Sequence, residues 1–303
     1  MHLWVTSSTY PPHLRFPVKS EAQVEEIRVC TNRTCRRQGS MQTFHILTAL
    51  APPDVSVKSC GCLGRCGAGP NVALLPDGQI VGHCGTAAGA AELMVGLWHG
   101  GGVGDACNKS KSKTSLDALA LRMRAEALVD EGNFSKAERL LSQAIDLKPF
   151  GGVHILYKKR SVARLAIHNY SGALEDAAES LTLAPNYAGA YICQGDAFLA
   201  MDQYDAAQKS YSTCLEIDPS IRRSKSFKIR IAKLEEKLAT INMSHDSISE
   251  TKGVDRSNDS LTLEPPNLNT STHEQEQYES KRPRLNPEEI DAFHIELILD
   301  YDQ

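Results

Sequence analysis

Hydrophobic and polar positions divide the chain into two patterned segments. In the first, apolar residues form short strand-like runs and helix-like runs, and Asp77-Gly78 provides a turn that is typical of β-hairpins. The predicted strands are residues 27–30, 55–59, 71–75 and 79–84, and the predicted helices are residues 36–50 and 87–98. The pattern predicts an α/β segment with the order β-α-β-β-β-α.

The second segment, residues 117–240, repeats itself. Small residues recur at two fixed distances before prolines that stand 36 and 34 residues apart. The prolines are Pro149, Pro185 and Pro219, and the small residues are Ala125, Ser161 and Gly195, then Ala137, Ala173 and Ala207. This spacing resembles the tetratricopeptide repeat (TPR), in which paired helices cross closely where side chains are small. It implies an all-α solenoid of three repeats.

These two segments define the predicted domain boundaries. A thioredoxin-like domain is expected over residues 26–100, and three TPR repeats plus a polar capping helix over residues 117–241. Residues 1–25 are expected to be a disordered or transit-like segment, residues 101–116 a Gly-, Ser- and Lys-rich linker, and residues 242–303 a mostly disordered tail. A last amphipathic stretch begins at Pro287 and is either a short docking helix or a frayed tail.

Composition narrows the class of protein. The net charge of −4 is nearly balanced, which argues against a nucleic-acid partner, and no apolar run approaches the roughly 18 residues of a membrane span. The nine cysteines are unevenly placed, unlike those of a secreted disulfide scaffold. A reducing compartment, with thiolates used as ligands, fits better.

Four cysteines form the candidate site. Cys30 and Cys35 follow the first strand, and Cys62 and Cys66 lie in a glycine-rich run after the second. A 2Fe–2S cluster needs four ligands of this kind, and glycines let loops wrap a cluster closely. Nearby arginines would offset its negative charge; these are Arg33, Arg36, Arg37 and Arg65.

At these residues the chain resembles the thioredoxin-like 2Fe–2S ferredoxins, a family that includes a subunit of respiratory complex I. The resemblance covers about residues 26–100 and rests on the cysteine spacing, the run from Cys62 to Pro70 and the hairpin at Pro76-Asp77-Gly78. It implies that Cys30, Cys35, Cys62 and Cys66 ligate a 2Fe–2S cluster. It also implies one-electron transfer or redox sensing with an unknown redox partner, and homodimers through this domain.

An alternative stays open at this point. Zinc is usually held through C-x2-C knuckles, and the chain has none. The alternative is a TPR interaction scaffold, a co-chaperone-like adaptor, whose first domain is structural and holds zinc or no metal. No catalytic constellation is visible, so we expect an electron carrier or an adaptor rather than a stand-alone catalyst. The other cysteines are expected to be bystanders, core residues or a free linker thiol; they are Cys60, Cys84, Cys107, Cys193 and Cys214.

The TPR segment implies a protein partner in the groove lined by the first helices of the repeats. One TPR subclass clamps the acidic C-terminus of chaperones with a fixed Lys/Asn/Asn/Lys/Arg set. The corresponding positions here are Arg122, Glu126, Lys159, Gly189 and Cys193. Only the first keeps its charge, which predicts against chaperone-tail clamping. A basic run on the second of these helices is either a solvated face or a site for an acidic segment; it comprises Lys158, Lys159, Arg160 and Arg164.

Location is predicted from the domain combination, which resembles plant and algal proteins and implies a plastid (chloroplast). The basic tetrad Lys281-Arg282-Pro283-Arg284 is a minimal match to a nuclear import signal. Cytoplasm or nucleus is therefore the alternative.

Overall fold

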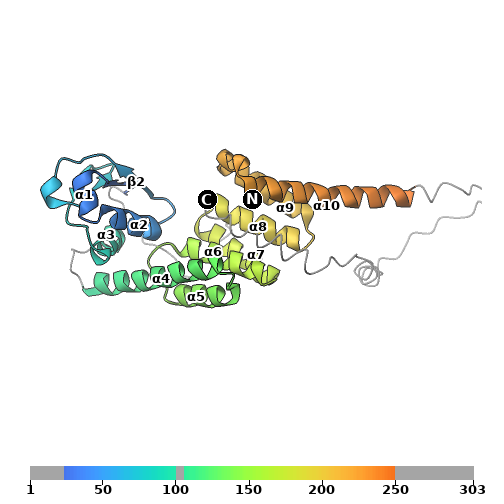
Figure 1. The fold of residues 1–303 in the computed structure, drawn as a ribbon, viewed down its shortest axis with the longest axis horizontal. Helices are drawn as coiled ribbons and strands as arrows, with labels where there is room; N and C mark the ends of the chain where they lie inside the picture. Colours follow the sequence, from blue (N-terminus) through green and yellow to red (C-terminus); the bar gives the residue numbers. More distant parts are fainter. Residues whose placement is uncertain (1–23, 100–105, 250–303) are drawn as a thin grey trace, which may run out of the picture. The chain divides into compact units, whose positions relative to one another are not determined.

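The computed structural model describes residues 24–99 and 106–249, with side chains up to residue 241. The chain divides into two compact units, Met1–Asp105 and Ala106–Gln303 (Figure 1). The N-terminal segment, the nuclear-import tetrad and the last amphipathic stretch lie outside the described residues. None of the helices in the described ranges combines the length and apolar character that a bilayer crossing requires.

The first unit is built on a four-stranded sheet with the order β2-β1-β3-β4. Strand β1 is parallel to β2 and antiparallel to β3, and β4 pairs antiparallel with β3. The strands are β1 (Glu26–Cys30), β2 (Ser56–Cys60), β3 (Val72–Leu75) and β4 (Gln79–Val81), and the helices are α1 (Arg33–Arg37), α2 (Ser40–Leu50) and α3 (Ala87–His99). A short 3-10 turn, η2 (Cys66–Ala68), precedes β3. The predicted order of elements is confirmed.

The core of this unit lies between the central strands and the two longer helices. Helix α2 packs on β1 and β2 and contacts α3. Ile27 and Val29 of β1, Leu47 of α2 and Met94 of α3 are fully buried. Burying each of these side chains contributes about 1.5–3 kcal/mol, so this core fixes where the loops after β1 and β2 end.

Two local boundaries differ from the sequence prediction. The helix expected over residues 36–50 is split, because Gly39 has a φ of 95°, a left-handed conformation that only glycine adopts without strain. The hairpin turns at Gly78, with a φ of 71°, as predicted. Its second strand ends at Val81 rather than Cys84, because the backbone of residues 83–84 bonds to the loop before β3.

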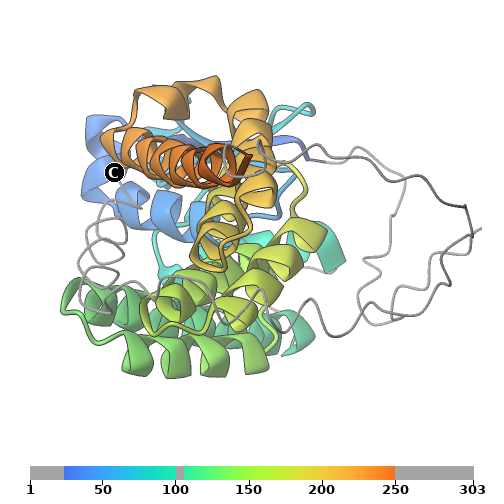
Figure 2. The ribbon, with the colours of Figure 1, turned by 90° about the vertical axis from the view of Figure 1, so that its right-hand side faces the viewer.

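The second unit consists of antiparallel helix pairs followed by a long last helix (Figures 1 and 2). The pairs are α4 (Ala106–Asp130) with α5 (Phe134–Asp146), α6 (Val153–Ala166) with α7 (Tyr170–Leu183), and α8 (Ala188–Ala200) with α9 (Tyr204–Ile217). A 3-10 helix, η3 (Pro219–Arg223), leads into α10 (Lys225–Ser249). These three pairs occupy the residues predicted for three TPR repeats, and α10 occupies those predicted for the cap and continues beyond residue 241.

The small repeat residues lie where the paired helices cross. Ala125, Ala137, Ala173 and Ala207 have no exposed surface. The Ser161 hydroxyl donates to the Ala173 carbonyl oxygen at 2.7 Å, which joins the crossing point of α6 and α7. Small residues are therefore required because the two backbones approach closely there.

Residues 106–116, predicted as part of a linker, are helical and form the first turns of α4. Polar residues in these turns are buried, and the Phe150 backbone N–H donates to the Ser115 hydroxyl at 2.9 Å. Docking against the loop after α5 orders a sequence whose composition alone suggests a flexible linker.

Candidate functional site

Strand pairing brings the two cysteine segments together at one end of the sheet. Cys30 ends β1 and lies opposite Cys60, the last residue of the parallel strand β2. Cys35 lies on α1 and is buried, whereas Cys62 and Cys66 are exposed in the loop after β2. The sulfur atoms of Cys62 and Cys66 are 3.5 Å apart. The four cysteines predicted as ligands thus come from the end of β1, from α1 and from the loop after the neighbouring strand β2.

Hydrogen bonds fix the loop that carries Cys62 and Cys66. The Gly64 backbone N–H donates to the Cys62 sulfur at 3.4 Å. The buried Asn71 amide donates to the Arg65 carbonyl oxygen at 2.7 Å and approaches the Cys35 sulfur at 3.7 Å. Asn71, which the sequence analysis did not single out, therefore ties the loop to α1.

The thiols differ in how their surroundings shift their pKa values. Burial raises the pKa of Cys30, but hydrogen bonds from the backbone of Asn32 and Leu63 outweigh it, so the net pKa is lowered. Burial raises the pKa of Cys35 and of Cys60, and the charge of Cys30 adds to both shifts. The hydrogen bond and the charge of Cys62 raise the pKa of Cys66.

This arrangement does not fit a metal centre. Within residues 24–99 and 106–241, no group of three or more His, Cys, Asp or Glu side chains is placed so that it could hold a metal ion. Two of the four predicted ligands are buried and two are exposed. The ligand set of Cys30, Cys35, Cys62 and Cys66 and its 2Fe–2S cofactor therefore stay predictions, and no chemistry is derived from them.

The second candidate site is the face formed by the first helices of the repeats. Helix α6 contacts both α4 and α8, so these three helices form one layer. The Glu126 carboxylate on α4 lies 3.5 Å from the Arg122 guanidinium on the same helix and 3.5 Å from the Lys159 ammonium on α6. One acidic side chain thus bridges the two cations of this face.

The remaining clamp positions carry no charge. The Cys193 side chain on α8 is fully buried and its sulfur lies 3.9 Å from the Lys158 carbonyl oxygen. A Cβ at Gly189 would lie 3.6 Å from the Lys158 side chain, so α8 begins close against α6.

His154 is buried next to Arg122, and burial and that charge together lower its pKa to about 4.

Apart from Lys159, the predicted basic run on α6 is neither a solvated face nor an open site for an acidic segment. The Arg160 guanidinium donates to both oxygens of Asp176 on α7, at 2.9 and 2.7 Å. Arg164 pairs with Glu138 at 3.3 Å and with Asp176 at 3.1 Å. Lys158 is only 4 % exposed. Arg160 and Arg164 thus join α6 to α5 and α7, which the sequence did not reveal because their acidic partners are distant in sequence.

A further buried cluster joins the last repeat to the cap. The Tyr211 hydroxyl donates to Asp196 at 2.6 Å, and the Arg230 guanidinium donates to both Asp196 oxygens at 2.9 Å. Arg230 is 2 % exposed. No spacing along the chain pointed to this triad, since each residue comes from a different helix.

Comparisons with known proteins identify the repeats. A family model described as "Tetratricopeptide repeat" matches residues 188–221. The wheat Hsp70-Hsp90 organizing protein is 36% identical over 99 residues, which cover 33% of this chain and 17% of that protein. The yeast heat shock protein STI1 is 30% identical over 111 residues, covering 37% of this chain and 19% of that protein. The second unit is a TPR domain.

Among solved structures, the chain is similar to "First TPR of Spaghetti (RPAP3) bound to HSP90 peptide SRMEEVD". The identity is 23% and the TM-score 0.37, over 41% of this chain and 98% of that one. This chain spans less than a fifth of the length of the curated relatives named above.

These findings correct one prediction. The ferredoxin and electron-transfer assignment is wrong: the relatives named above are described as an Hsp70-Hsp90 organizing protein and a heat shock protein, and nothing in the comparisons or the described residues supports an iron–sulfur centre. The scaffold alternative is confirmed at the level of a TPR domain. The plastid location and the homodimer stay predictions.

Proposed function

We propose that this chain is an adaptor of the co-chaperone class, whose TPR domain binds a segment of a partner protein on the face of α4, α6 and α8. The support is the 36% identity with the wheat Hsp70-Hsp90 organizing protein over 99 residues, together with the tetratricopeptide family match at residues 188–221. The rest of that relative has no counterpart in the match, so only the binding role of its repeats is brought to this chain.

Charge on this face decides which segment it prefers. Arg122 and Lys159 are the cations that an acidic segment would reach, but Glu126 lies 3.5 Å from each. An incoming carboxylate must displace the Glu126 carboxylate or share the cations with it, because like charges repel at this range. Contrary to the expectation from the five clamp positions, we propose that the face still binds an acidic chaperone tail through Arg122 and Lys159, and that Glu126 weakens this binding.

The test uses the full chain and the labelled peptide Ser-Arg-Met-Glu-Glu-Val-Asp, the HSP90 segment bound by the solved relative. Fluorescence anisotropy gives the affinity. We expect Glu126→Gln to tighten binding by about three- to tenfold and Lys159→Ala to weaken it by a similar factor, as expected for one charged contact of about 1 kcal/mol.

Lys136→Ala is the matched control, since Lys136 is an exposed cation on α5, the second helix of the first repeat. Its affinity should equal that of the unchanged chain. Failure of the peptide to bind either the unchanged chain or the Glu126→Gln variant would refute the proposal.

For the first unit we propose a thioredoxin-like fold in a structural role. The support is the mixed sheet, in which the parallel pair β1–β2 is joined through helices and the antiparallel pair β3–β4 is followed by α3. The central strand should exchange its backbone amide hydrogens slowest. Rapid exchange at Ile27 and Val29 would contradict this arrangement.

A further inference from the structure

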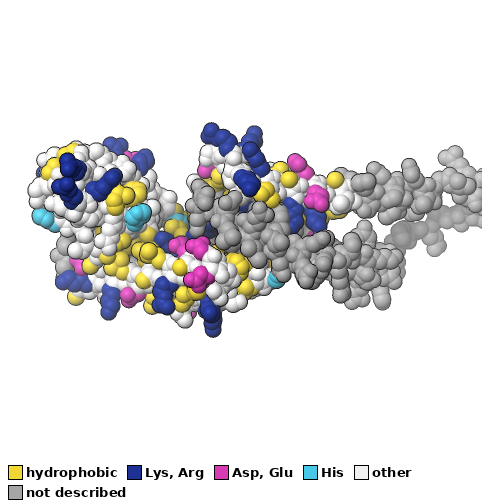
Figure 3. Space-filling model, viewed as in Figure 1, with side chains coloured by type: hydrophobic (Ala, Val, Ile, Leu, Met, Phe, Trp, Pro, Cys, Tyr) yellow, Lys and Arg dark blue, Asp and Glu magenta, His cyan; other side chains and the backbone are white. Residues whose placement is uncertain are grey.

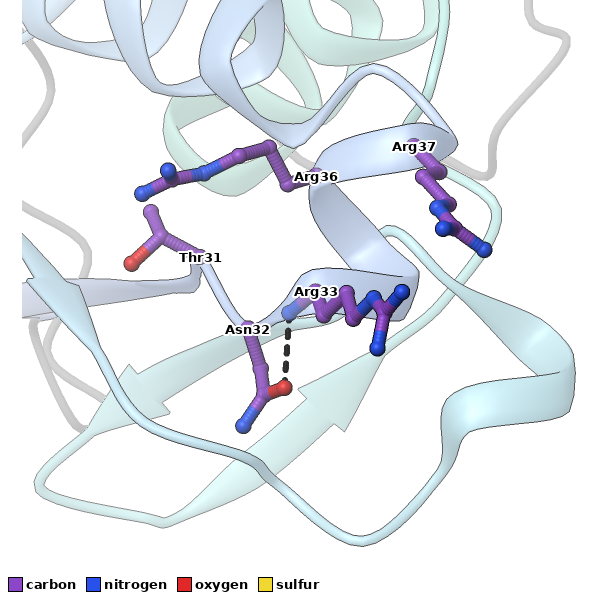
Figure 4. A pocket seen from close by; sticks show the side chains of 5 residues that line it. All are labelled: Thr31, Asn32, Arg33, Arg36 and Arg37. Carbon is purple, nitrogen blue, oxygen red and sulfur yellow. Dashed lines mark hydrogen bonds between the residues drawn. The ribbon is translucent and has the colours of Figure 1, made fainter.

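An open pocket lies beside α1, on the first unit. Its volume is ≈ 550 Å³, and it is lined by Thr31, Asn32, Arg33, Arg36 and Arg37 (Figure 4). Figure 3 shows Lys and Arg side chains gathered on the face of this unit over α1. The correction of the electron-transfer assignment leaves these three arginines without the role that the sequence suggested for them.

The three guanidinium groups carry no internal counter-charge in the described part of the chain. No ion pair joins Arg33, Arg36 or Arg37 to a described acidic side chain, whereas Arg28 on β1 pairs with Glu26. Arg33 and Arg37 are four residues apart on α1 and lie on the same side in Figure 4, and Arg36 extends toward Thr31. Like charges at this spacing oppose each other unless an anion joins them.

Hydrogen-bond capacity in the pocket is almost entirely that of donors. Arginine has five N–H donors and no acceptor. The Asn32 amide oxygen already accepts from the Arg33 backbone N–H at 2.6 Å, which leaves its NH₂ group to donate. The Thr31 hydroxyl donates its hydrogen to the Cys60 carbonyl oxygen at 3.3 Å, so it leaves only acceptor capacity, which the arginine donors outnumber. Such a lining fits a ligand that only accepts hydrogen bonds.

The short helix that presents the arginines is anchored. Cys35, between Arg33 and Arg36, is 1% exposed and packs into the unit. The Arg36 backbone N–H donates to the Asn32 carbonyl oxygen at 2.8 Å, and the Gln38 N–H donates to that of Cys35 at 3.0 Å. The backbone of the pocket is therefore held before any ligand arrives, which reduces the entropy lost on binding.

We propose that this pocket binds the phosphate group of a phosphorylated protein segment. A phosphate monoester carries about −1.5 to −2 charges and three acceptor oxygens, which match the guanidinium groups of Arg33 and Arg37 on one side of α1, with Arg36 adding positive charge from the side of Thr31. No aromatic or large apolar side chain lines the pocket, so a nucleotide base would find no surface on which to stack. A phosphate group on a protein segment does not require such a stacking surface. The chain then has a second contact for a protein partner, besides the TPR face.

The probe is a labelled peptide, Gly-Ala-phosphoserine-Ala-Gly, titrated into the full chain and followed by fluorescence anisotropy. We expect saturable binding that is at least about tenfold tighter than that of the unphosphorylated peptide and that weakens as salt is added. The variant Arg33→Gln/Arg36→Gln/Arg37→Gln should lose about tenfold or more. The affinity of Arg36→Lys should lie between those of the unchanged chain and the triple variant, because lysine keeps the charge but lacks the planar guanidinium that donates two parallel hydrogen bonds.

The matched control is Arg222→Gln/Arg223→Gln/Lys225→Gln, which removes the same charge from exposed residues of η3 and α10. Its affinity should stay within about twofold of the unchanged chain. Circular dichroism checks folding, and Arg37→Gln alone replaces the triple variant if that variant unfolds.

Equal binding of both peptides, equal losses in the two triple variants, or tighter binding of adenosine monophosphate than of the phosphopeptide would overturn the proposal. These outcomes are independent of whether the chaperone peptide binds the TPR face, so the two proposals can fail separately.

Discussion

At the scale of single residues, the burial of charge separates structural from binding side chains. Asp196 and Arg230 are buried and satisfied by each other and by Tyr211. Removing one partner of such a pair leaves an uncompensated charge that costs several kcal/mol. Glu126, Arg122 and Lys159 are less buried and their contacts are longer, so their pairing can be exchanged for a ligand.

His154 gives a prediction of pH dependence. Burial and the neighbouring Arg122 charge lower its pKa to about 4, from 6.5. Between these values the unfolded chain binds a proton that the folded chain does not, so stability falls as the pH falls through this window. The loss below about pH 4 amounts to about 3 kcal/mol, and none occurs above the unfolded pKa.

The measurement is urea unfolding at about pH 7.5 and about pH 4.5. In His154→Gln the difference in free energy of unfolding between these pH values should shrink by about 2 kcal/mol. His45→Gln, at an exposed histidine of the first unit, should leave the difference unchanged. An identical pH dependence in His154→Gln and the unchanged chain would show that His154 titrates normally.

At the scale of elements, the repeat depends on how closely two helices approach. A Cβ added at Gly195 on α8 would meet the ring of Tyr211 on α9. Tyr211 is 1% exposed and hydrogen-bonded to Asp196, so its ring cannot move aside. The position is small because of the neighbouring helix and not because of its own backbone.

Gly195→Ala should therefore destabilise the TPR domain by about 1–3 kcal/mol, although alanine favours the helix by about 1 kcal/mol. Gly189→Ala is the control on the same helix, because its Cβ would meet neighbours at an ordinary distance of 3.5 Å or more. We expect no loss of stability there. Thermal unfolding followed by circular dichroism measures both, and a Gly195→Ala variant as stable as the unchanged chain would contradict the close crossing.

At the scale of the whole molecule, the chain consists of two units with separate cores. Trp98 lies on α3 in the first unit, and the second unit contributes most of the helix. Tryptophan fluorescence and far-ultraviolet circular dichroism therefore report on different units.

Separate cores predict separate unfolding. In a Trp4→Phe background, Gly195→Ala should lower the transition seen by circular dichroism by about 4–8 °C per kcal/mol lost, or less. The transition seen by Trp98 fluorescence should not move. A shared shift would mean that the two units unfold as one cooperative body.

The sequence alone determined the order of elements and the repeat, because both depend on local spacing. Periodicity located the strands of the first unit, the turn at Gly78 and the small residues of the TPR pairs. It did not locate the break at Gly39 or the helical start of α4. The former depends on a backbone conformation, and the latter on docking against a loop after α5.

The roles of the charged and sulfur-bearing side chains depended instead on how distant segments pack. The basic run on α6 became internal ion pairs because Asp176 and Glu138 lie on other helices. Glu126 was placed between Arg122 and Lys159 by the contact of α4 with α6. Cysteine spacing predicted a cluster, whereas ligand geometry depends on how two loops meet in space. Spacing along a chain fixes local conformation, but the partner of a buried charge or thiol is fixed only when distant segments pack.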